Sequence, residues 1–399
     1  MKIINGDTLE ELKKMPDESI DVVITSPPYY MLRSYLPLGH TKKEREIGLE
    51  DSPEEYLEKL LAVTNEIKRV LKRSGSVWWN HGDSYDKNGN MYMMPEAFAM
   101  RMQQQGWVLR QKIIWAKQIL VDNRTIGPIM PTSVKTRFNP SYEYIFHFIR
   151  EDACSDYYIL VSKEIPEVCE KYKYGVWKKE EIPPEYLHFF RNLKYYFDLD
   201  AVRLPHQVQG VTDLRPPGVL RQRTYEGSKY NKYNYIPSKT GLLVSTFRQE
   251  DTEDKYNKRG FSKRYKSQRK NPNYKGMRQA PEPGEEGAFC EKGKNIPTVW
   301  QINPQPHAFE KEFGVEIEHF AAFPDELPEI PIKVSCPPKG VVLDPFCGSG
   351  TVGVVCQRLK RKFIGIDINP KYCELTRLRI EKEKSKIEKE ENQLSLFEI

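Results

Sequence analysis

Apolar and polar positions in the first 120 residues follow two alternating patterns. Residues 20–25 form a short, mostly apolar run that is typical of a buried strand, and residues 77–79 predict a second one. Residues 56–71 carry apolar side chains three and four positions apart, which predicts a helix. Residues 95–105 are also expected to be helical, and residues 108–115 extended. This alternation favours a parallel, doubly wound sheet and therefore an α/β fold.

The ends of the first long helix carry boundary signals. Ser52 and Glu55 form a potential capping box, and Pro53 falls at the first helical position, where its missing N–H is not needed. Gly75 is expected to end this element. Farther along, the alternation in residues 142–148 predicts an edge strand or hairpin.

The pattern changes in the middle of the chain and then returns. Between about residues 205 and 295 the chain is rich in Pro, Gly, Asn, Tyr, Lys and Arg, with few periodic apolar runs. This predicts a loop-rich module that could not fold around a large core alone. Residues 341–343 and 363–366 then predict strands, and residues 351–359 and 371 onward predict helices.

The composition permits a nucleic-acid partner without requiring one. The 399 residues carry a net charge of +6, which an ordinary solvated surface could also have. The seven cysteines include no Cys-x-x-Cys pair and no His cluster has zinc-site spacing, so we expect a reduced, metal-free protein of the cytoplasm. No charged leader precedes an apolar core and no apolar run approaches ~20 residues, so we expect neither secretion nor membrane insertion.

Two short motifs lie near opposite ends of the chain, each directly after a predicted strand. Thr-Ser-Pro-Pro-Tyr-Tyr occupies residues 25–30, and Asp-Pro-Phe-Cys-Gly-Ser-Gly-Thr occupies residues 344–351. Because open α/β folds bind ligands at the carboxyl ends of strands, we expect two halves of one site. Gly348 and Gly350 let the backbone approach a ligand closely. The motif lacks the third glycine of a dinucleotide fingerprint and the Gly-Lys-Ser/Thr of a phosphate loop, so neither a nicotinamide cofactor nor ATP is favoured.

Both motifs resemble those of the DNA amino-methyltransferases, and their order is similar to that of the β class, in which the catalytic motif comes first. The resemblance implies a Rossmann-like fold that binds S-adenosyl-L-methionine, acts on double-stranded DNA and belongs to restriction-modification. It also implies a catalytic half in residues 1–204, a target-recognition insertion in 205–300, a cofactor half in 301–380 and a charged tail in 381–399.

The resemblance assigns one group of residues to the cofactor. Asp344 would meet the methionine ammonium, and Asp367 could accept hydrogen bonds from both ribose hydroxyls. Asp7 resembles the acid that faces the adenine amino group, although an ordinary turn aspartate explains it as well. The complete expected set is Asp7, His319, Phe320, Phe323, Pro324, Asp344, Phe346, Gly348, Gly350, Thr351 and Asp367.

Ser26, Pro27, Pro28 and Tyr29 are expected to form the catalytic site. The two prolines fix the backbone and remove two N–H donors, which leaves carbonyl acceptors free to face a ligand. An exocyclic amino group of a flipped base could donate to the Ser26 side chain and the Pro27 carbonyl while Tyr29 stacks on the ring. The amino nitrogen could then be aimed at the sulfonium methyl without a covalent enzyme intermediate.

The target base depends on one residue of this motif. Similar enzymes with Ser-Pro-Pro-Tyr commonly modify cytosine N4, whereas Asp-Pro-Pro-Tyr is typical of adenine N6, so Ser26 favours cytosine and leaves adenine as the alternative. An RNA or protein amide target, or a DNA-binding shell without activity, are further alternatives. Methylation of cytosine C5 by a thiolate is disfavoured, because Cys336 is expected in a loop and no separate Pro-Cys motif follows.

Two further segments of the chain resemble segments of the same family less specifically. Asn80, His81 and Asp83 follow the predicted strand at residues 77–79 and either line the pocket or form a satisfied network at the strand end. Residues 300–304 resemble the segment that leads back into the cofactor half.

Residues 255–278 contain ten Lys and Arg and no Asp or Glu, with aromatic residues interleaved. They are either a solvated linker or a DNA-tracking segment whose cations neutralise phosphates, and their position between the two halves favours the second. The expected DNA contacts are Lys255, Lys258, Arg259, Lys263, Arg264, Lys266, Arg269 and Lys270.

Beyond Ile380 the chain becomes mostly Lys and Glu, which is typical of a solvated face or a frayed tail. The residues that follow resemble the short peptide by which bacterial replication proteins dock into the sliding clamp, or they fold back onto the domain. This peptide comprises Gln393, Leu394, Leu396 and Phe397. The clamp hypothesis implies a bacterial or viral setting, with the protein in the cytoplasm at the nucleoid.

Overall fold

The computed structural model describes residues 1–37, 39–121, 124–126, 136–160, 171–172, 176–192, 194–204, 212–213, 234–237, 243–246, 295–305, 309–315 and 322–395. The backbone forms two compact units. The first comprises Met1–Val202 together with Asn295–Ile399, and the second comprises Arg203–Lys294.

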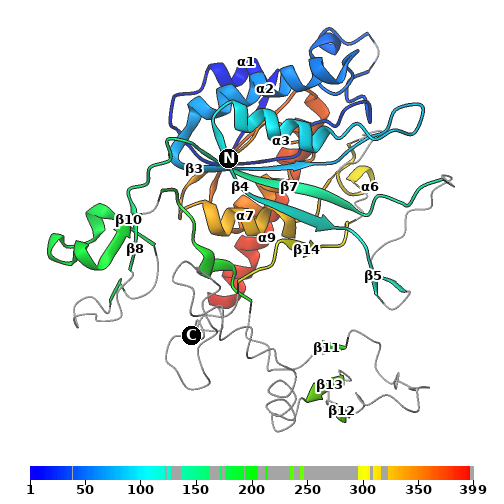
Figure 1. Ribbon diagram of the computed structural model, residues 1–399. Coiled ribbons are helices and arrows are strands. Elements are labelled where there is room, and N and C mark those ends of the chain that lie inside the picture. The colour runs from blue at the N-terminus through cyan, green and yellow to red at the C-terminus, as the bar shows by residue number, and fades with distance from the viewer. Residues whose placement is uncertain are drawn as a thin grey trace, which may run out of the picture. The chain divides into compact units, whose positions relative to one another are not determined.

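An eight-stranded sheet forms the centre of the first unit (Figure 1). β7 is antiparallel to both of its neighbours, and the other adjacent strands are parallel. This confirms the expected α/β fold with a mostly parallel sheet. In spatial order the strands are β1 (Lys2–Asn5), β16 (Lys362–Asp367), β15 (Val341–Asp344), β2 (Ile20–Thr25), β3 (Leu71–His81), β7 (Tyr142–Arg150), β4 (Trp107–Ala116) and β14 (Val299–Gln301).

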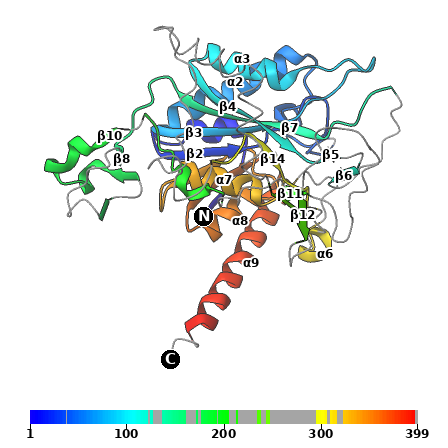
Figure 2. The same cartoon turned by 60° about the horizontal axis from the view of Figure 1, so that its bottom comes forward.

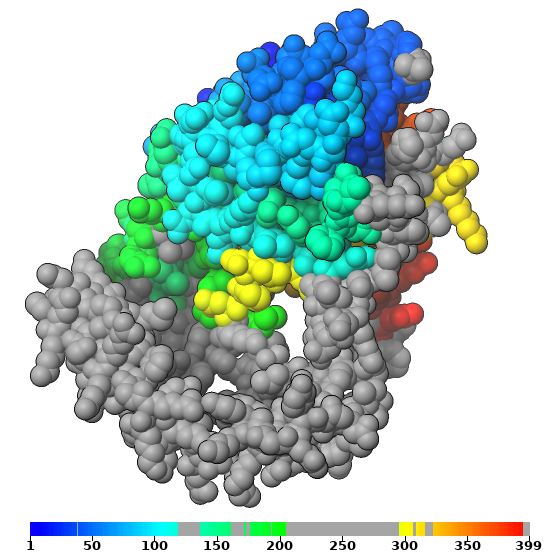
Figure 3. Space-filling view, turned by 45° about the vertical axis from the view of Figure 1, so that its right-hand side comes forward, coloured from blue at the N-terminus to red at the C-terminus, as the bar shows by residue number. Residues whose placement is uncertain are grey.

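Helices cover both faces of this sheet (Figure 1). On one face lie α1 (Thr8–Lys13), α2 (Pro53–Val70) and α3 (Met94–Gln104), and on the other lie α7 (Glu326–Ser335), α8 (Thr351–Arg358) and α9 (Pro370–Ser395). Every residue of β2 is buried, as expected for a strand covered on both faces. Figure 3 shows β14 (yellow) beside β4 (cyan) at the surface, in agreement with their parallel pairing.

The helix α2 begins as expected but ends earlier. The Ser52 side chain accepts a hydrogen bond from the Glu55 N–H at 3.2 Å, and Pro53 is the first helical residue. The expectation that Gly75 ends this element is wrong, because the helix ends at Val70 and Gly75 lies inside β3. A side chain at Gly75 would place its Cβ 2.6 Å from the Asp21 carbonyl oxygen of the neighbouring strand, so glycine serves sheet packing there.

The prediction of an edge strand or hairpin at residues 142–148 is also wrong. This segment is β7, which pairs along its length with β3 on one side and β4 on the other. Phe146 and Phe148 pack into the core beneath α2 and α3, while Ile145 packs into the core on the opposite face. The alternating pattern in residues 142–148 therefore comes from a strand that is buried on both faces, and not from a strand with one buried and one solvated face.

Smaller elements complete the described residues. The first unit also contains a three-stranded sheet, a short hairpin, the helix α6 (Phe309–Phe313) and several 3-10 turns. The sheet comprises β8 (Tyr157–Leu160), β9 (Val176–Lys178) and β10 (Phe190–Asn192), the hairpin β5 (Ile119–Val121) and β6 (Arg124–Ile126), and the turns η1 (Lys43–Arg45), η3 (Lys179–Glu181), η4 (Pro184–Phe189) and η5 (Leu199–Val202). In the second unit, a small sheet is formed by β11 (Thr212–Asp213), β13 (Leu243–Thr246) and β12 (Asn234–Pro237).

The charged tail is helical through Ser395, where α9 ends (Figure 2). Residues 381–393 of this helix are mostly exposed, in agreement with the expected solvated face and not with a frayed tail. Among the helices that the structure describes, none combines the length and apolar character needed to cross a bilayer.

Candidate functional site

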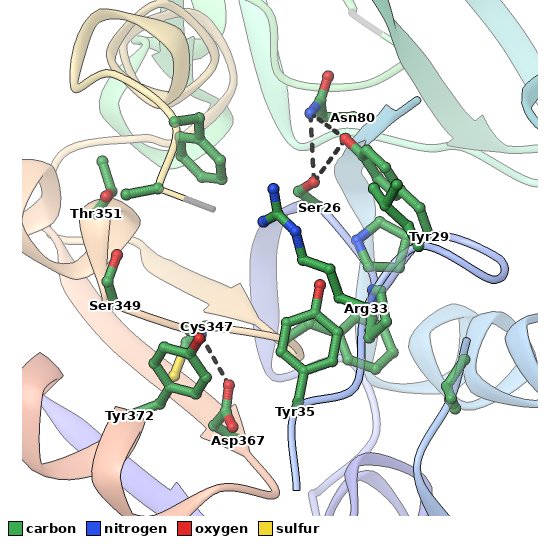
Figure 4. A pocket seen from close by; sticks show the side chains of 18 of the residues that line it. Ser26, Tyr29, Arg33, Tyr35, Asn80, Cys347, Ser349, Thr351, Asp367 and Tyr372 are labelled. Carbon is green, nitrogen blue, oxygen red and sulfur yellow. Dashed lines mark hydrogen bonds between the residues drawn. The ribbon is translucent and has the colours of Figure 1, made fainter. Parts of the chain in front are cut away.

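A cavity of about 420 Å³ opens among the loops that follow β2, β15 and β16 (Figure 4). Open parallel sheets bind ligands at this edge. Residues from both sequence motifs meet here, although they come from opposite ends of the chain. The expected site residues that line the cavity are Asp7, Ser26, Pro27, Pro28, Tyr29, Phe323, Phe346, Gly348, Thr351 and Asp367.

Asp367 lies at the end of β16 with its carboxylate at the cavity wall. One oxygen accepts the Gly348 N–H at 2.9 Å, and the other accepts the Asn369 N–H at 2.8 Å. Burial raises the pKa of Asp367 to about 6. Each oxygen keeps acceptor capacity beyond the single N–H bond, so the carboxylate can receive two further hydroxyl donors from a ligand.

The loop between β15 and α8 owes its shape to its glycines. Gly350 is the N-cap of α8 and has a φ of 80°, in the left-handed region that glycine tolerates best. A Cβ at this position would also lie 2.5 Å from Thr376, so close packing against α9 excludes a side chain. Gly350 does not line the cavity and instead shapes the loop that does.

Asp344 lies beneath the cavity and not in its wall. Its side chain is 1% exposed, and its Oδ1 accepts hydrogen bonds from the Thr25 hydroxyl at 2.7 Å and the Phe346 N–H at 3.1 Å. The bond to Thr25 joins residues 319 positions apart and links the strand before Ser26 to the cofactor loop. Burial raises the pKa of Asp344 to about 7. Contact between this carboxyl and a ligand ammonium stays a prediction.

The other expected cofactor residues take varied positions. Asp7 caps α1 by accepting the Glu10 N–H at 3.0 Å, so the turn role is present at a residue that also lines the cavity. Phe323 lines the cavity, whereas Pro324 does not. His319 and Phe320 lie outside the described residues.

A hydrogen-bond network surrounds the catalytic motif (Figure 4). The Ser26 hydroxyl lies 3.1 Å from the Tyr29 hydroxyl, which donates to Glu143 Oε2 at 2.8 Å. Asn80 Nδ2 lies 2.9 Å from the Tyr29 oxygen and 2.8 Å from Glu143 Oε2. Burial, followed by the negative charge of Glu143, raises the pKa of Tyr29 well above its usual value. Tyr29 is therefore a neutral phenol at physiological pH.

The two proline carbonyls differ in their hydrogen bonding. The Pro28 carbonyl accepts a hydrogen bond from the Tyr56 hydroxyl at 2.9 Å. Within the described part of the chain, nothing donates to the carbonyl of Pro27, which lines the cavity. Pro27 thus offers a free acceptor beside Ser26.

Asn80, His81 and Asp83 were expected either to line the pocket or to form a network at the end of β3, and the structure differs from one residue to the next. Asn80 lines the cavity. His81 is buried against Tyr56, whose hydroxyl lies 3.0 Å from its Nε2, and burial lowers the pKa of His81 to about 3. Asp83 accepts hydrogen bonds from the backbone of Ser84 and from Met93 and Met94 at the start of α3. Asp83 is therefore satisfied at the strand end, whereas His81 uses only its Nε2 and its buried Nδ1 has no partner among the described residues. Of the three residues, only Asn80 borders the cavity.

The cysteines near the site do not favour thiolate chemistry. Cys336 follows α7 in a connecting loop, as expected, and burial raises its pKa to about 12. Cys347 lines the cavity, but burial raises the pKa of its thiol well above the usual value. A thiol must ionise to become a strong nucleophile, so neither residue is suited to that role.

Sequence reasoning missed Glu143 and Lys117, which face the catalytic motif from β7 and the end of β4. Glu143 interrupts the aromatic and aliphatic run of residues 142–146, and this is the signal in the sequence that could have identified it. Arg33 and Tyr35 were also missed; both lie between the catalytic and cofactor sides of the cavity (Figure 4).

Several expected functional residues cannot be placed. The basic segment at residues 255–278 lies outside the described residues, as do Leu396 and Phe397 of the terminal peptide. Gln393 and Leu394 belong to α9. In the described parts of the chain, no group of three or more His, Cys, Asp or Glu residues could hold a metal ion.

The fold and the site define an α/β enzyme whose catalytic and cofactor motifs meet at one sheet edge. The chain belongs to the N6_N4_Mtase family of DNA methylases, whose profile matches residues 20–378. It is therefore a DNA amino-methyltransferase, and its cofactor is S-adenosyl-L-methionine, as the resemblance implied.

Relatives extend over most of the chain. The Type II methyltransferase M.SmaI of Serratia marcescens is 26% identical, and the alignment covers 95% of this chain and 90% of that protein. M.Cfr9I of Citrobacter freundii is 25% identical over 96% of this chain and 89% of its own length. Among solved structures, the cytosine-N4-specific PvuII DNA methyltransferase is 18% identical with a TM-score of 0.48, covering 94% of this chain and 85% of that one.

The residues of the site fit this cofactor. Asp344 and Asp367 are buried acids with raised pKa values, and a ligand that brings positive charge and hydroxyl donors would stabilise their ionised forms. When bound, the cofactor supplies an electrophilic methyl group on a sulfonium. The glycine turn at Gly348 and Gly350 lets the loop backbone approach it closely.

Proposed function

We propose that the protein methylates the exocyclic N4 of cytosine at a specific sequence in double-stranded DNA. The observation that carries this proposal is the position of Ser26 beside the free Pro27 carbonyl, in the same cavity that Phe346 and Gly348 of the loop after β15 line. Serine at this motif position favours cytosine over adenine, because the similar adenine enzymes typically carry aspartate there. The Type II relatives support a place in a restriction-modification system.

In this proposal each motif residue has a separate task. Ser26 Oγ and the Pro27 carbonyl accept the two amino hydrogens of a flipped base, and the Tyr29 ring packs against that base. Asp367 receives the ribose hydroxyls of the cofactor, and Asp7 faces its adenine. Residues 205–300 read the DNA sequence. DNA as the substrate places the enzyme in the cytoplasm at the nucleoid.

Methyl transfer then depends mainly on positioning. The amino nitrogen is held in line with the methyl group and displaces the sulfur directly, so no covalent bond to the protein forms.

Analysis of the methylated nucleoside tests the proposal. DNA incubated with the protein and cofactor is digested to nucleosides and examined by mass spectrometry. N4-methyldeoxycytidine is expected. N6-methyldeoxyadenosine would assign the alternative base, and no methylated nucleoside would indicate a shell without activity.

Substitution of Ser26 tests the site itself. Ser26→Ala should abolish methyl transfer and leave cofactor affinity within about twofold, because Ser26 belongs to the base-binding side of the cavity. A variant that lost cofactor binding and thermal stability together would show that Ser26 serves folding instead.

A further inference from the structure

A continuous hydrogen-bond chain leads from the catalytic serine to a carboxylate on β7. Ser26 Oγ and the Tyr29 hydroxyl are 3.1 Å apart, and the Tyr29 hydroxyl donates to Glu143 Oε2 at 2.8 Å. The other oxygen of Glu143 forms an ion pair with Lys117 at the end of β4. The Glu143 side chain is 14% exposed, so it retains a path to solvent.

The number of available protons fixes the direction of this chain. An ionised carboxylate only accepts hydrogen bonds, so the single Tyr29 proton points to Glu143. The Tyr29 oxygen, which also faces Asn80 Nδ2, can then only accept in its 3.1 Å contact with Ser26, and this uses the only hydrogen of the Ser26 hydroxyl. Asn80 Nδ2 lies 3.3 Å from Ser26 Oγ and faces one of its lone pairs, so Ser26 Oγ presents its remaining lone pair, and no hydrogen, to the cavity. This is the polarity that an incoming amino group requires.

The orientation of the Asn80 side-chain amide supports the same hydrogen-bond direction. Its Nδ2 lies within hydrogen-bond distance of Ser26, Tyr29 and Glu143, while its Oδ1 is buried without a partner among the described residues. Rotating the amide by 180° would place Oδ1 against the Glu143 carboxylate, with two acceptors facing each other. The charge on Glu143 therefore orients the amide at the cost of one unpaired buried oxygen.

We propose that Glu143 is a positioning residue that fixes Ser26 as a hydrogen-bond acceptor, and that it is the final proton acceptor of methyl transfer. This inference rests on the proposed role of Ser26 in holding the target amino group. The protonated form of Tyr29 is favoured by its surroundings, so Tyr29 can pass a hydrogen along without holding a charge itself.

The proton movements balance as follows. The amino nitrogen forms a bond to the methyl carbon, and the methyl–sulfur bond breaks with its electron pair remaining on sulfur. The nitrogen then carries one hydrogen too many and a positive charge. That proton passes to Ser26 Oγ, the Ser26 hydrogen passes to Tyr29, and the Tyr29 hydrogen passes to Glu143. The products are a neutral methylamino base, a neutral thioether and a protonated Glu143, which later releases its proton to solvent.

Tyr29→Phe and Glu143→Gln test this chain. Both variants keep the size of the side chain, and phenylalanine also keeps the ring that could stack on a base. Single-turnover methyl transfer is measured with radiolabelled S-adenosyl-L-methionine and amplified, unmethylated bacterial genomic DNA. Each variant should lose at least about 100-fold in rate at pH 7.5, since acid–base catalysis typically contributes about 10²–10⁴-fold. Cofactor affinity should remain within about twofold.

Two further measurements separate a proton relay from a purely structural ion pair. The double variant should be no slower than either single variant by more than about threefold, because one break already interrupts the chain. Glu143→Asp, which keeps a carboxylate, should recover part of the rate that Glu143→Gln loses, whereas a role in packing alone would not distinguish the two.

The matched control is Glu96→Gln, which removes another carboxylate paired with a β4 lysine, Lys112, at 2.6 Å and outside the cavity. Its rate should equal that of the wild type. A wild-type rate in Tyr29→Phe, multiplicative losses in the double variant, or a rate in Glu143→Asp no higher than in Glu143→Gln would each overturn the relay. If the wild type methylates no DNA base, the proposed function fails instead, because the relay concerns only ratios of rates.

Discussion

Replacing Asp344 with asparagine should make the cofactor-free protein more stable at neutral pH. The Asp344 carboxyl is buried beneath the cavity, and its Oδ1 accepts hydrogen bonds from the Thr25 hydroxyl and the Phe346 N–H. The side chain introduced by Asp344→Asn has nearly the same shape as the carboxyl, and its amide oxygen can accept both bonds. The substitution therefore removes a buried charge and keeps the local contacts.

The magnitude follows from the pKa of this carboxyl. Burial raises the pKa from 3.8 to about 7 in the folded protein. Because the folded pKa lies above the unfolded value, Asp344 contributes most stability below about pH 4, and that contribution is lost as the pH rises to about 7. At about 1.4 kcal/mol for each pH unit, the loss reaches up to about 4 kcal/mol. The free energy of unfolding of Asp344→Asn should exceed that of the wild type by up to this amount at pH 8.

Urea denaturation at a series of pH values measures this difference. The difference in the free energy of unfolding between Asp344→Asn and the wild type should be smallest at pH 4, increase up to pH 7 and then stay constant. Asp51→Asn, which makes the same chemical change at an exposed carboxylate, is the control and should follow the wild type. A gap that does not change with pH, or a wild type more stable than Asp344→Asn at pH 8, would refute the reasoning.

The remaining predictions concern the base pocket and the tail. Gly82→Ala should reduce methyl transfer at least about tenfold with cofactor affinity retained, because a Cβ there would lie 2.5 Å from the Tyr29 ring and displace it. Single-turnover kinetics and calorimetric titration of the cofactor measure the two effects, and an unchanged rate would contradict this one. The full chain should retain a bacterial sliding clamp in a pull-down, whereas a chain ending at Asn392 should not. Equal retention of the clamp by both chains would exclude the terminal peptide as its docking site.

The local sequence predicts the elements that carry the two motifs because their signals are short-range. The strand β2 has its expected bounds, and a strand, glycine turn and helix follow one another at Asp344 as expected. These segments are buried on both faces, so continuous apolar runs define them without knowledge of their neighbours.

The residues that the sequence did not reveal depend on pairing between distant strands. Glu143 faces the catalytic motif because β7 inserts antiparallel between β3 and β4, where it pairs opposite Trp115. Nothing within residues 142–150 specifies those neighbours, and a hairpin would fit the same pattern. Asp344 is the opposite example. The sequence motif identified this residue, but its hydrogen bond to Thr25 and its position beneath the cavity depend on how the strands assemble into the sheet.

The pairing of β1 with β16 has a consequence for the synthesis of this protein. The Asn5 side chain donates to the Asp367 carbonyl across 362 residues of sequence, so the strand β1 meets its partner only after that intervening chain has been synthesised. At typical rates of about 5–20 residues per second, the interval is roughly 20–70 s. During that time the apolar strand β2 lacks its neighbour β15, so the nascent chain presents an unpaired strand edge that favours aggregation. We therefore expect the sheet to be completed late and with the help of chaperones, and the two motifs to meet only after β15 and β16 have been synthesised.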